Sequence, residues 1–303
     1  MYNCLFDEPW WLDAVAPGAW DEVIVEKGGA IYARLPFVLR RRFGLRMVTM
    51  PSLTQTLGPW LRLESPKYVN RLALEKELML SLIEKLPKYD IFFQNFHSSI
   101  TNWLPFYWSG YSQTTRYTYV IDNARSLEDI WSGMSDKTRN EIRKAESKHG
   151  LRVEEQRDLD ALYNLIVATF SRQGKPVPYS RALLERIESA CTARGCGQTF
   201  ICSDGYGKRY AAIYVVWDQK SAYYLLSGSD PALRNTGALS LLLWHAIKYL
   251  HSRTACFDFE GSWVPSIESH FRSFGGTQTT YFNVTRANTL GSLYLKARIR
   301  FRR

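Results

Sequence analysis

The chain has 303 residues, of which 46% are hydrophobic and 22% charged, and its formal net charge is +10. This composition is typical of a globular protein with one large domain or two smaller ones. No apolar run reaches about 18 residues, which excludes a membrane-spanning helix, and the acidic N-terminal segment does not have the pattern of a secretory signal. We therefore expect a cytoplasmic protein whose five cysteines are free thiols.

The positive charge is concentrated in three clusters. Residues 34–46 hold five arginines and no acid, residues 137–148 hold five basic side chains, and the last eight residues hold five with no acid. Such clusters raise the local concentration of anionic partners, for which a nucleotide, a tRNA, a phosphorylated lipid precursor and an anionic membrane surface are candidates. The alternative is that any single cluster serves only to keep the protein soluble.

The N-terminal part reads as a small α/β unit. Gly28-Gly29 stands between two runs of strand-forming residues and predicts a two-residue hairpin turn. The elements expected here are the hairpin strands 21–25 and 30–39, a strand at 45–50, a helix at 68–86, and strands at 90–96 and 114–121.

The second half, after a boundary near residues 123–126, holds helices, then a meander of strands, and then alternating helices and strands. The expected helices are 126–134, 135–149, 159–173, 180–193, 237–250 and 265–274, and the expected strands are 151–155, 198–202, 210–217, 222–227, one around Asp258, and 277–284. This order predicts an α+β fold rather than a doubly wound sheet.

The segment Phe257-Asp-Phe-Glu260 is the most informative stretch for chemistry. Because a strand has a side-chain period of two, it carries aromatics on one face and two carboxylates, Asp258 and Glu260, on the other. A core strand does not need two acids on one face, so we expect this strand to border a polar cleft. Ser262 follows as a cap of a short helix.

Two further segments are suited to holding anions. Arg139 and Arg143 lie one turn apart on a mostly polar helix and can grip a phosphate together, although the helix can equally be a solvated one with internal ion pairs. Arg234 and Asn235 precede a helix whose free amides can bind an anion, although Asn235 can equally be only the helix cap. No metal-ligand spacing, nucleophile elbow, phosphate-binding loop or dinucleotide motif is present in the sequence.

Three stretches together resemble the Fem-type peptidyltransferases of the GNAT superfamily. They are KTRNEIRKAESKHGLRV, RNTGALSLLLWHAIKYL, and FDFEGS followed by FRSFGG. The resemblance implies two tandem GNAT-like domains with mixed, mostly antiparallel sheets flanked by helices. The expected divisions are a degenerate N-terminal domain at 1–123, a C-terminal domain at 124–290 and a basic tail at 291–303.

The resemblance also implies a function. It is the transfer of an acyl or aminoacyl group from acyl-CoA or aminoacyl-tRNA, as co-substrate, to an amine of a cell-envelope or polysaccharide precursor that is lipid-linked or nucleotide-linked. GNAT enzymes bind the CoA pyrophosphate through a Q/R-x-x-G-x-G/A loop. Here Arg234 and Gly237 match that loop and Leu239 departs from it. This favours the Fem branch, where the donor is an aminoacyl-tRNA.

The predicted site follows from these stretches. Asp258 or Glu260 accepts the amine proton, and Arg272, before the Phe-Gly pair, stabilises the oxyanion; Glu260 pairing with Arg272 to fix the cleft is the alternative. The predicted donor-binding and substrate-binding residues are Lys137, Arg139, Arg143, Lys144, Tyr224, Arg234, Asn235, Gly237 and Ser262.

Two rival readings remain open. A degenerate GNAT-like pair can bind tRNA or an anionic lipid-linked precursor without chemistry, and its binding would also be salt-sensitive. The C-terminal tail interleaves apolar and basic residues and can contact a membrane surface at the inner face.

Overall fold

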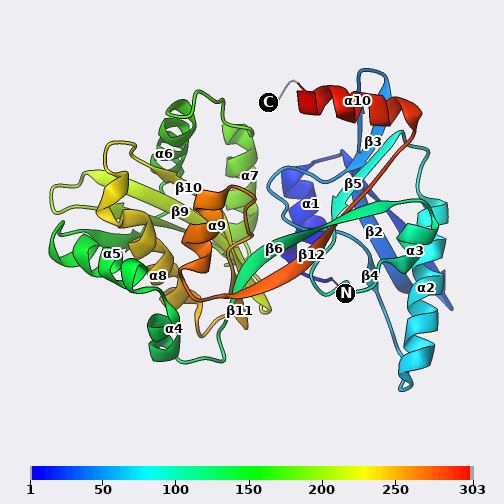
Figure 1. The fold of residues 1–303 in the computed structure, drawn as a ribbon, viewed down its shortest axis with the longest axis horizontal. Coiled ribbons are helices and arrows are strands. Elements are labelled where there is room, and N and C mark those ends of the chain that lie inside the picture. The colour runs from blue at the N-terminus through cyan, green and yellow to red at the C-terminus, as the bar shows by residue number, and fades with distance from the viewer. Residues whose placement is uncertain (1, 301–303) are drawn as a thin grey trace. The chain divides into compact units, whose positions relative to one another are not determined.

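The computed structural model describes residues 2–300, with side chains as far as residue 297. The chain divides into two compact units (Figure 1). Unit 1 comprises Met1–Arg116 with Thr280–Arg303, and unit 2 comprises Tyr117–Thr279. The last residues of the predicted basic tail lie outside the described residues. Among the helices of residues 2–300, none combines the length and hydropathy needed to cross a bilayer.

Unit 1 is a mostly antiparallel sheet with the strand order β1-β2-β3-β5-β12, in which only β3 and β5 are parallel. Its strands are β1 (Trp20–Lys27), β2 (Ala30–Arg42), β3 (Leu45–Thr49), β5 (Ile91–Asn95) and the second part of β12 (Thr277–Ala287), with β4 (Trp60–Leu61) paired to β2. Its helices are α1 (Pro9–Val15), α2 (Tyr68–Lys85), α3 (Leu104–Trp108) and α10 (Thr289–Arg300).

The hairpin and the core of unit 1 follow from its sequence. Gly28 and Gly29 both have positive φ, 58° and 77°, which the favoured two-residue hairpin turn requires and glycine allows at little cost. The hairpin prediction is confirmed. Leu78 and Leu82 of α2 are buried against Val48 and Phe92 of the sheet. One face of the sheet is therefore covered by α2.

Unit 2 has the strand order β6-β11-β10-β9-β8-β7, antiparallel except for the pair β10–β11. Its strands are β6 (Ser112–Asp122), β11 (Cys256–Asp258), β10 (Ser221–Ser229), β9 (Arg209–Trp217), β8 (Gly197–Ser203) and β7 (Arg152–Glu155). Its helices are α4 (Leu127–Gly133), α5 (Asp136–Ser147), α6 (Leu159–Ser171), α7 (Arg181–Thr192), α8 (Ala238–Leu250) and α9 (Pro265–Arg272).

The core of unit 2 is built around α8 and a group of phenylalanines. α8 is apolar over most of its circumference, which is the pattern of a buried helix, and nine of its thirteen residues are buried. Phe257, Phe259, Phe271 and Phe274 are all buried in the same core. The predicted α+β fold is confirmed.

The structure differs from the sequence prediction at several elements. Helices α1, α3 and α10 and the two-residue strand β4 were not predicted. α1 and α3 are short and rich in aromatics, and α10 lies mostly in the segment interpreted as a tail. The strand predicted around Asp258 ends at that residue, since the backbone turns at Glu260. Ser135 caps α5 by accepting the Thr138 amide at 3.2 Å, which agrees with the expected start of this helix at residue 135. Ser262 accepts the amide of Val264 at 3.1 Å, one turn before α9 begins.

The division of the chain also differs from the expected boundaries at residues 123 and 290. The contacts assign residues 280–303 to unit 1, because the second part of β12 pairs with β5, from Asn283 opposite Asn95 to Ala287 opposite Ile91. Likewise β6 begins in unit 1 and ends in unit 2. A periodic pattern shows that a strand exists, but it does not show which distant strand will be its partner.

Candidate functional site

The strands β10 and β11 diverge in the middle of unit 2. They pair only from Ser221 opposite Cys256 to Tyr223 opposite Asp258, and β10 then continues alone on that side to Ser229. The β11 chain turns away because Glu260 and Gly261 both have left-handed backbone, with φ of 61° and 69°. The parallel pair is thus opened along the second half of β10.

Glycine is required at this turn. A Cβ at Gly261 would lie 2.0 Å from the carbonyl oxygen of Tyr117 on β6, so any other residue would displace one of the two chains. Glu260 holds a left-handed backbone without that freedom, which costs an L-residue about 1 kcal/mol or more. The sequence FDFEGS therefore encodes a strand that stops abruptly rather than one that continues.

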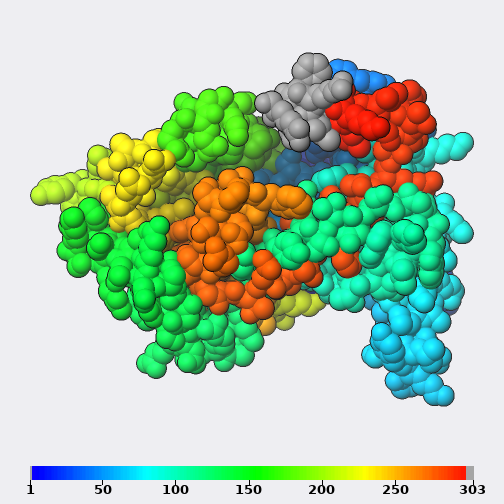
Figure 2. Space-filling model, viewed as in Figure 1, coloured from blue at the N-terminus to red at the C-terminus, as the bar shows by residue number. Residues whose placement is uncertain are grey.

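A cavity of about 400 Å³ lies along the diverging half of β10; we call it the β10–α9 cavity. Its walls come from β10, from the C-terminal end of α6, from the start of α8 and from α9. The lining residues are Thr169, Arg172, Gln173, Tyr224, Ser227, Gly228, Ser229, Leu239, Ser266, Ile267, His270 and Phe271. Figure 2 shows the surface of unit 2 on which α9 (orange) and α5 (green) are exposed.

His270 is the candidate base in this cavity. Its Nε2 atom is buried, and within the described part of the chain no hydrogen-bond partner reaches that nitrogen. Burial lowers the pKa of His270 below its ordinary value of 6.5; the charge of Glu141 opposes this effect and that of Lys137 adds to it. The imidazole is therefore neutral at pH 7, and a neutral imidazole without a partner can accept a proton from a bound group.

Tyr224 lines the same cavity from β10. Its ring packs edge-on against Phe271, with the ring centroids 5.7 Å apart. Burial raises the pKa of Tyr224, and the charge of Glu260 raises it further, so the phenol keeps its proton at neutral pH. A protonated phenol can donate a proton or a hydrogen bond into the cavity.

A second cavity of about 360 Å³ adjoins the start of α8; we call it the α8 cavity. His270, Leu239 and Ser266 line both cavities. The remaining lining residues are Glu141, Arg234, Asn235, Gly237 and Ser240. The structure thus brings three predicted donor-binding residues, Arg234, Asn235 and Gly237, together at this helix start.

A carboxylate of the chain itself occupies the start of α8. Ser240, in the first turn, donates its hydroxyl hydrogen to Glu141 Oε2 at 3.1 Å. Gly237 has φ of 81°, and a Cβ on it would lie 2.5 Å from the carbonyl oxygen of Glu141, so α5 passes very close to this residue. The positive end of a helix attracts an anion, and here Glu141 already supplies one.

Asp258 and Glu260 are half-buried and are absent from the lining of both cavities. Asp258 Oδ1 accepts the hydroxyl hydrogen of Thr118 and the backbone amide of Glu260, the latter at 2.7 Å. Burial raises the pKa of Asp258 to about 6. Burial and the charge of Asp258 raise the pKa of Glu260 well above its ordinary value. Their hydrogen bonds fix the turn that opens the cavity.

The basic side chains of α5 are held by their neighbours on the exposed side of unit 2. Arg139 donates to the Ser132 carbonyl at 3.0 Å and to the Asp136 carboxylate. Arg143 lies over the ring of Trp131, with its guanidinium carbon 5.4 Å from the ring centroid. Lys144 is exposed in the last turn of the helix.

Lys137 and Arg272 form ion pairs within their own helices. Lys137 Nζ is 3.9 Å from Glu141 Oε1. Arg272 pairs with Glu268, with Nε 3.1 Å from Oε1, and not with Glu260 as the alternative reading expected. Arg272 is exposed and absent from the lining of both cavities.

His270 is the site residue that the sequence did not identify. A single histidine carries no ligand or triad spacing, so a search for motifs passes over it. The one available signal was its position four residues after Ser266 and three after Ile267, which places these side chains on one face of α9. That this face borders a cavity depends on the divergence of β10 and β11.

The comparisons with known proteins agree with this geometry. Residues 132–263 match the family described as an acetyltransferase (GNAT) domain, and this range includes α5, β10, the start of α8 and the FDFEGS turn. This part of the chain is similar to GNAT acetyltransferase domains. No curated protein sequence matches the chain at a significant level.

Solved structures with the same fold cover most of the chain. The crystal structure of FemX has a TM-score of 0.64 at 10% identity, covering 93% of this chain and 92% of FemX. The C-terminal domain of a putative lysylphosphatidylglycerol synthetase from Agrobacterium fabrum has a TM-score of 0.59 at 12% identity. The alignment covers 93% of this chain and 89% of that domain. A tandem GNAT protein from the clavulanic acid biosynthesis pathway has a TM-score of 0.52 at 11% identity, and the alignment covers 89% of this chain and 83% of that protein.

These structures confirm the predicted resemblance to Fem-like GNAT proteins at the level of the fold, which extends over both units. At 10–12% identity they carry no residue-level argument. Together with the matched domain they support a transferase of the acyltransferase class. The donor, the acceptor and the roles of single side chains have to be argued from this chain's own residues.

Proposed function

We propose that the chain is an N-acyltransferase whose reaction takes place in the β10–α9 cavity, with His270 as general base. The observation that carries the proposal is the buried, unpartnered Nε2 of His270 on the lining of both cavities of the GNAT domain. A buried polar atom without a partner costs about 1–3 kcal/mol, and a bound substrate hydrogen would recover that cost.

The proposed reaction is attack of an amine on an activated carbonyl. The amine nitrogen forms the new C–N bond while His270 Nε2 takes the proton that the nitrogen loses. The bond between the carbonyl carbon and the leaving oxygen or sulfur then breaks, and Tyr224 gives its phenolic proton to that atom. The lowered pKa of His270 keeps its imidazole unprotonated and the raised pKa of Tyr224 keeps its phenol protonated before the reaction. After the products leave, the His270 imidazolium loses its proton and the Tyr224 phenolate gains one through solvent, which restores both groups.

The predicted residues Asp258, Glu260 and Arg272 enter the proposal as supporting groups. Asp258 and Glu260 hold the turn that separates β11 from β10, through the hydrogen bond from the Glu260 amide to Asp258 Oδ1. Arg272 is 60% exposed and paired with Glu268, so we propose that it draws anionic substrates toward α9 rather than touching the reacting atoms.

The chain's residues do not fit the diphosphate of acyl-CoA at the start of α8. That position carries the Glu141 carboxylate, hydrogen-bonded to Ser240, and the glycine that would leave room for a ligand is instead in close contact with the Glu141 carbonyl. A diphosphate there would meet like charge at short range. We therefore propose an ester donor, an aminoacyl-tRNA, whose phosphates lie along the basic outer side of α5.

The acceptor is proposed to be an amine of a cell-envelope or polysaccharide precursor. The support is the shared fold with FemX and with a putative lysylphosphatidylglycerol synthetase, which by its name forms an aminoacylated phospholipid. The tight Ser227-Gly228-Ser229 segment of β10 suits a narrow chain, since Gly228 already packs directly on α6. We expect the acceptor amine to enter along this strand.

The deciding experiment compares donors with the full chain. Transfer of radiolabelled aminoacyl groups from a charged tRNA mixture, and of acetyl groups from acetyl-CoA, is measured with a nucleotide-linked muropeptide as the amine acceptor. We expect turnover with charged tRNA and little with acetyl-CoA. Turnover with acetyl-CoA alone would overturn the donor proposal. Tight tRNA binding without turnover from either donor would favour the non-catalytic binding module instead.

A further inference from the structure

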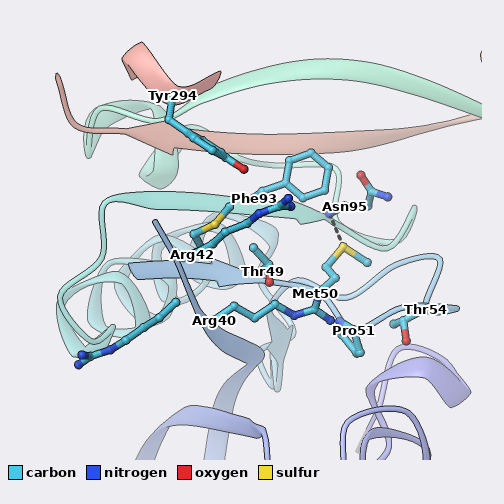
Figure 3. Close-up of a pocket in the computed structure, with 11 residues that line it drawn as sticks. Arg40, Arg42, Thr49, Met50, Pro51, Thr54, Phe93, Asn95 and Tyr294 are labelled. Carbon is cyan, nitrogen blue, oxygen red and sulfur yellow. Dashed lines mark hydrogen bonds between the residues drawn. The ribbon is translucent and has the colours of Figure 1, made fainter. Parts of the chain in front are cut away.

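A separate cavity of about 400 Å³ lies within unit 1, against the open face of its sheet (Figure 3). We call it the arginine cavity. It is lined by Arg40, Arg41, Arg42, Met47, Thr49, Met50, Pro51, Thr54, Phe93, Asn95 and Tyr294. Three of these eleven residues are cations and none is an acid. The cavity therefore carries a positive field that no lining carboxylate cancels.

The strand period places the lining on one face of the sheet. Arg40 and Arg42 of β2, Met47 and Thr49 of β3, and Phe93 and Asn95 of β5 are alternate residues of three neighbouring strands, with Arg40 directly opposite Met47. The residues between them, such as Val48 and Phe92, point to the other face and are buried with α2. Arg40 and Arg42 therefore stand on the face that α2 does not cover, whereas Arg41, between them in β2, starts from the opposite face.

The uncharged polar side chains of the cavity are already used within unit 1. Asn95 donates to the Gln55 carbonyl at 3.0 Å and accepts from Asn283 at 2.8 Å. Thr54 accepts the indole hydrogen of Trp11 at 3.0 Å. Thr49 donates to the Val38 carbonyl at 3.4 Å. The donors left for a ligand are those of the arginines and the Tyr294 hydroxyl.

Arg40 and Arg42 are exposed, and neither is in an ion pair with a carboxylate in the part of the chain that the structure describes. Arg42 lies over the ring of Phe43, 5.2 Å from its centroid, and Phe43 in turn contacts Tyr294 at 6.1 Å between centroids. Figure 3 shows Arg42 beside Phe93 with the Tyr294 hydroxyl turned to the same side, while Arg40 extends toward Met50 and Pro51.

We propose that the arginine cavity binds a phosphoryl group, held by Arg40 and Arg42, that is attached to an aromatic or apolar moiety. Two guanidinium groups on one sheet face supply several N–H donors, and guanidinium donors recognise phosphate oxygens. A phosphoryl group is much smaller than 400 Å³, which lies in the range of small-molecule sites. The remaining volume is bounded by Met47, Met50, Phe93 and Tyr294, which suit a base or a lipid chain.

This inference goes beyond the proposed transfer reaction, because it concerns a binding site in unit 1 that can be measured without turnover. The ligand's phosphate has two possible sources, a nucleotide and a phospholipid. Three probes separate them: inorganic pyrophosphate as the bare anion, adenosine diphosphate as the nucleotide, and phosphatidylglycerol vesicles as the lipid. Binding of the first two is measured by calorimetry and of the third by co-sedimentation, with the full chain.

The test compares two double variants of equal charge. Arg40→Ala with Arg42→Ala removes two of the three cations that line the cavity. Lys67→Ala with Arg71→Ala removes two exposed cations at the start of α2. We expect the first pair of substitutions to raise the dissociation constant of the probe at least tenfold, and the second pair to change it less than about twofold. Circular dichroism melting checks that both variants fold, which their exposed positions favour.

The outcomes are separable. Tighter binding of adenosine diphosphate than of pyrophosphate identifies a nucleotide site, and vesicle binding that depends on Arg40 and Arg42 identifies a lipid headgroup. The proposal is overturned if no probe binds with a dissociation constant below about 1 mM. It is also overturned if both double variants lose binding equally, because this would show only the attraction of a basic protein for anions.

Discussion

The β10–α9 cavity and the arginine cavity have the same volume, about 400 Å³, but they are built for different tasks. The first holds two neutral titratable groups, His270 and Tyr224, whose pKa values burial moves in opposite directions. The second holds three cations, and none of its lining residues has a side chain that can accept a proton at neutral pH. The difference indicates that the chain separates chemistry, in unit 2, from anion binding, in unit 1.

The largest expected effect tests this separation directly. His270→Ala removes the proposed base and should lower the transfer rate by about 10²–10⁴-fold, the usual contribution of general base catalysis. It should leave the binding of adenosine diphosphate to unit 1 unchanged. Arg272→Ala, on the exposed side of the same helix, is the matched control and should change kcat by less than about threefold. Equal losses in the two variants would remove His270 from the mechanism.

A second prediction concerns the turn that opens the β10–α9 cavity. The pKa of Asp258 is about 6 in the folded protein against an ordinary value of 3.8, so the wild type loses stability as pH rises through this interval, where the folded state holds the proton and the unfolded state has released it. In Asp258→Asn the side chain at residue 258 does not titrate, so the variant does not lose stability in this way as pH rises. A difference of about two pKa units corresponds to about 3 kcal/mol.

The measurement for Asp258→Asn is urea denaturation between pH 4 and pH 7.5. The free energy of unfolding of the variant, relative to wild type, should rise with pH by about 3 kcal/mol. Glu128→Gln, at an exposed position of α4, should show no such trend. A flat difference for Asp258→Asn would show that this carboxyl ionises in the folded protein as easily as in the unfolded one.

A third prediction sharpens the donor assignment. Glu141→Gln keeps the size of the side chain but removes the charge at the start of α8, so acetyl-CoA should bind about fivefold more tightly, which is about 1 kcal/mol of a helix-terminus interaction. Glu146→Gln, on the exposed side of α5, is the control and should have no effect. Unchanged affinity in Glu141→Gln, by calorimetry, would mean that this carboxylate does not exclude a diphosphate.

The smallest expected effect concerns the acid limb of the pH–rate profile, that is, the fall in rate at low pH. Because the base must be neutral, kcat/KM should fall as pH decreases through the pKa of His270, and this pKa lies below 6.5. The midpoint of this fall in kcat/KM should therefore lie below pH 6.5. In His270→Ala the residual rate should lack that limb. A limb centred above pH 7 in the wild type would point to a base other than His270.

The sequence predicted most elements of the fold because their signals are local. The glycine pair at residues 28–29, the apolar helix after Gly237 and the cap at Ser135 each depend on residues close in the chain. The α+β arrangement followed from the order of these elements, and the GNAT resemblance from three sequence stretches. The missed helices α1, α3 and α10 lacked such signals.

The candidate site was predicted less completely, for a physical reason. Alternation placed Asp258 and Glu260 on one strand face, but the left-handed backbone at Glu260 ends the strand first, and Asp258 turns to Thr118. The sequence located the start of α8 and Tyr224, whereas His270 became a candidate only when β10 and β11 were seen to diverge. Which buried atom lacks a partner is a property of packing, and it has no sequence pattern.

The pairing of β5 with β12 has a consequence for how the chain folds during synthesis. Asn95 pairs with Asn283, so unit 1 cannot close its sheet until the segment around Asn283 has been synthesised. All of unit 2 lies between these two partners and can fold as soon as it leaves the ribosome. The strands of unit 1 that precede unit 2 in the sequence are thus completed only after it, and the unpaired edge of β5 needs protection in the meantime.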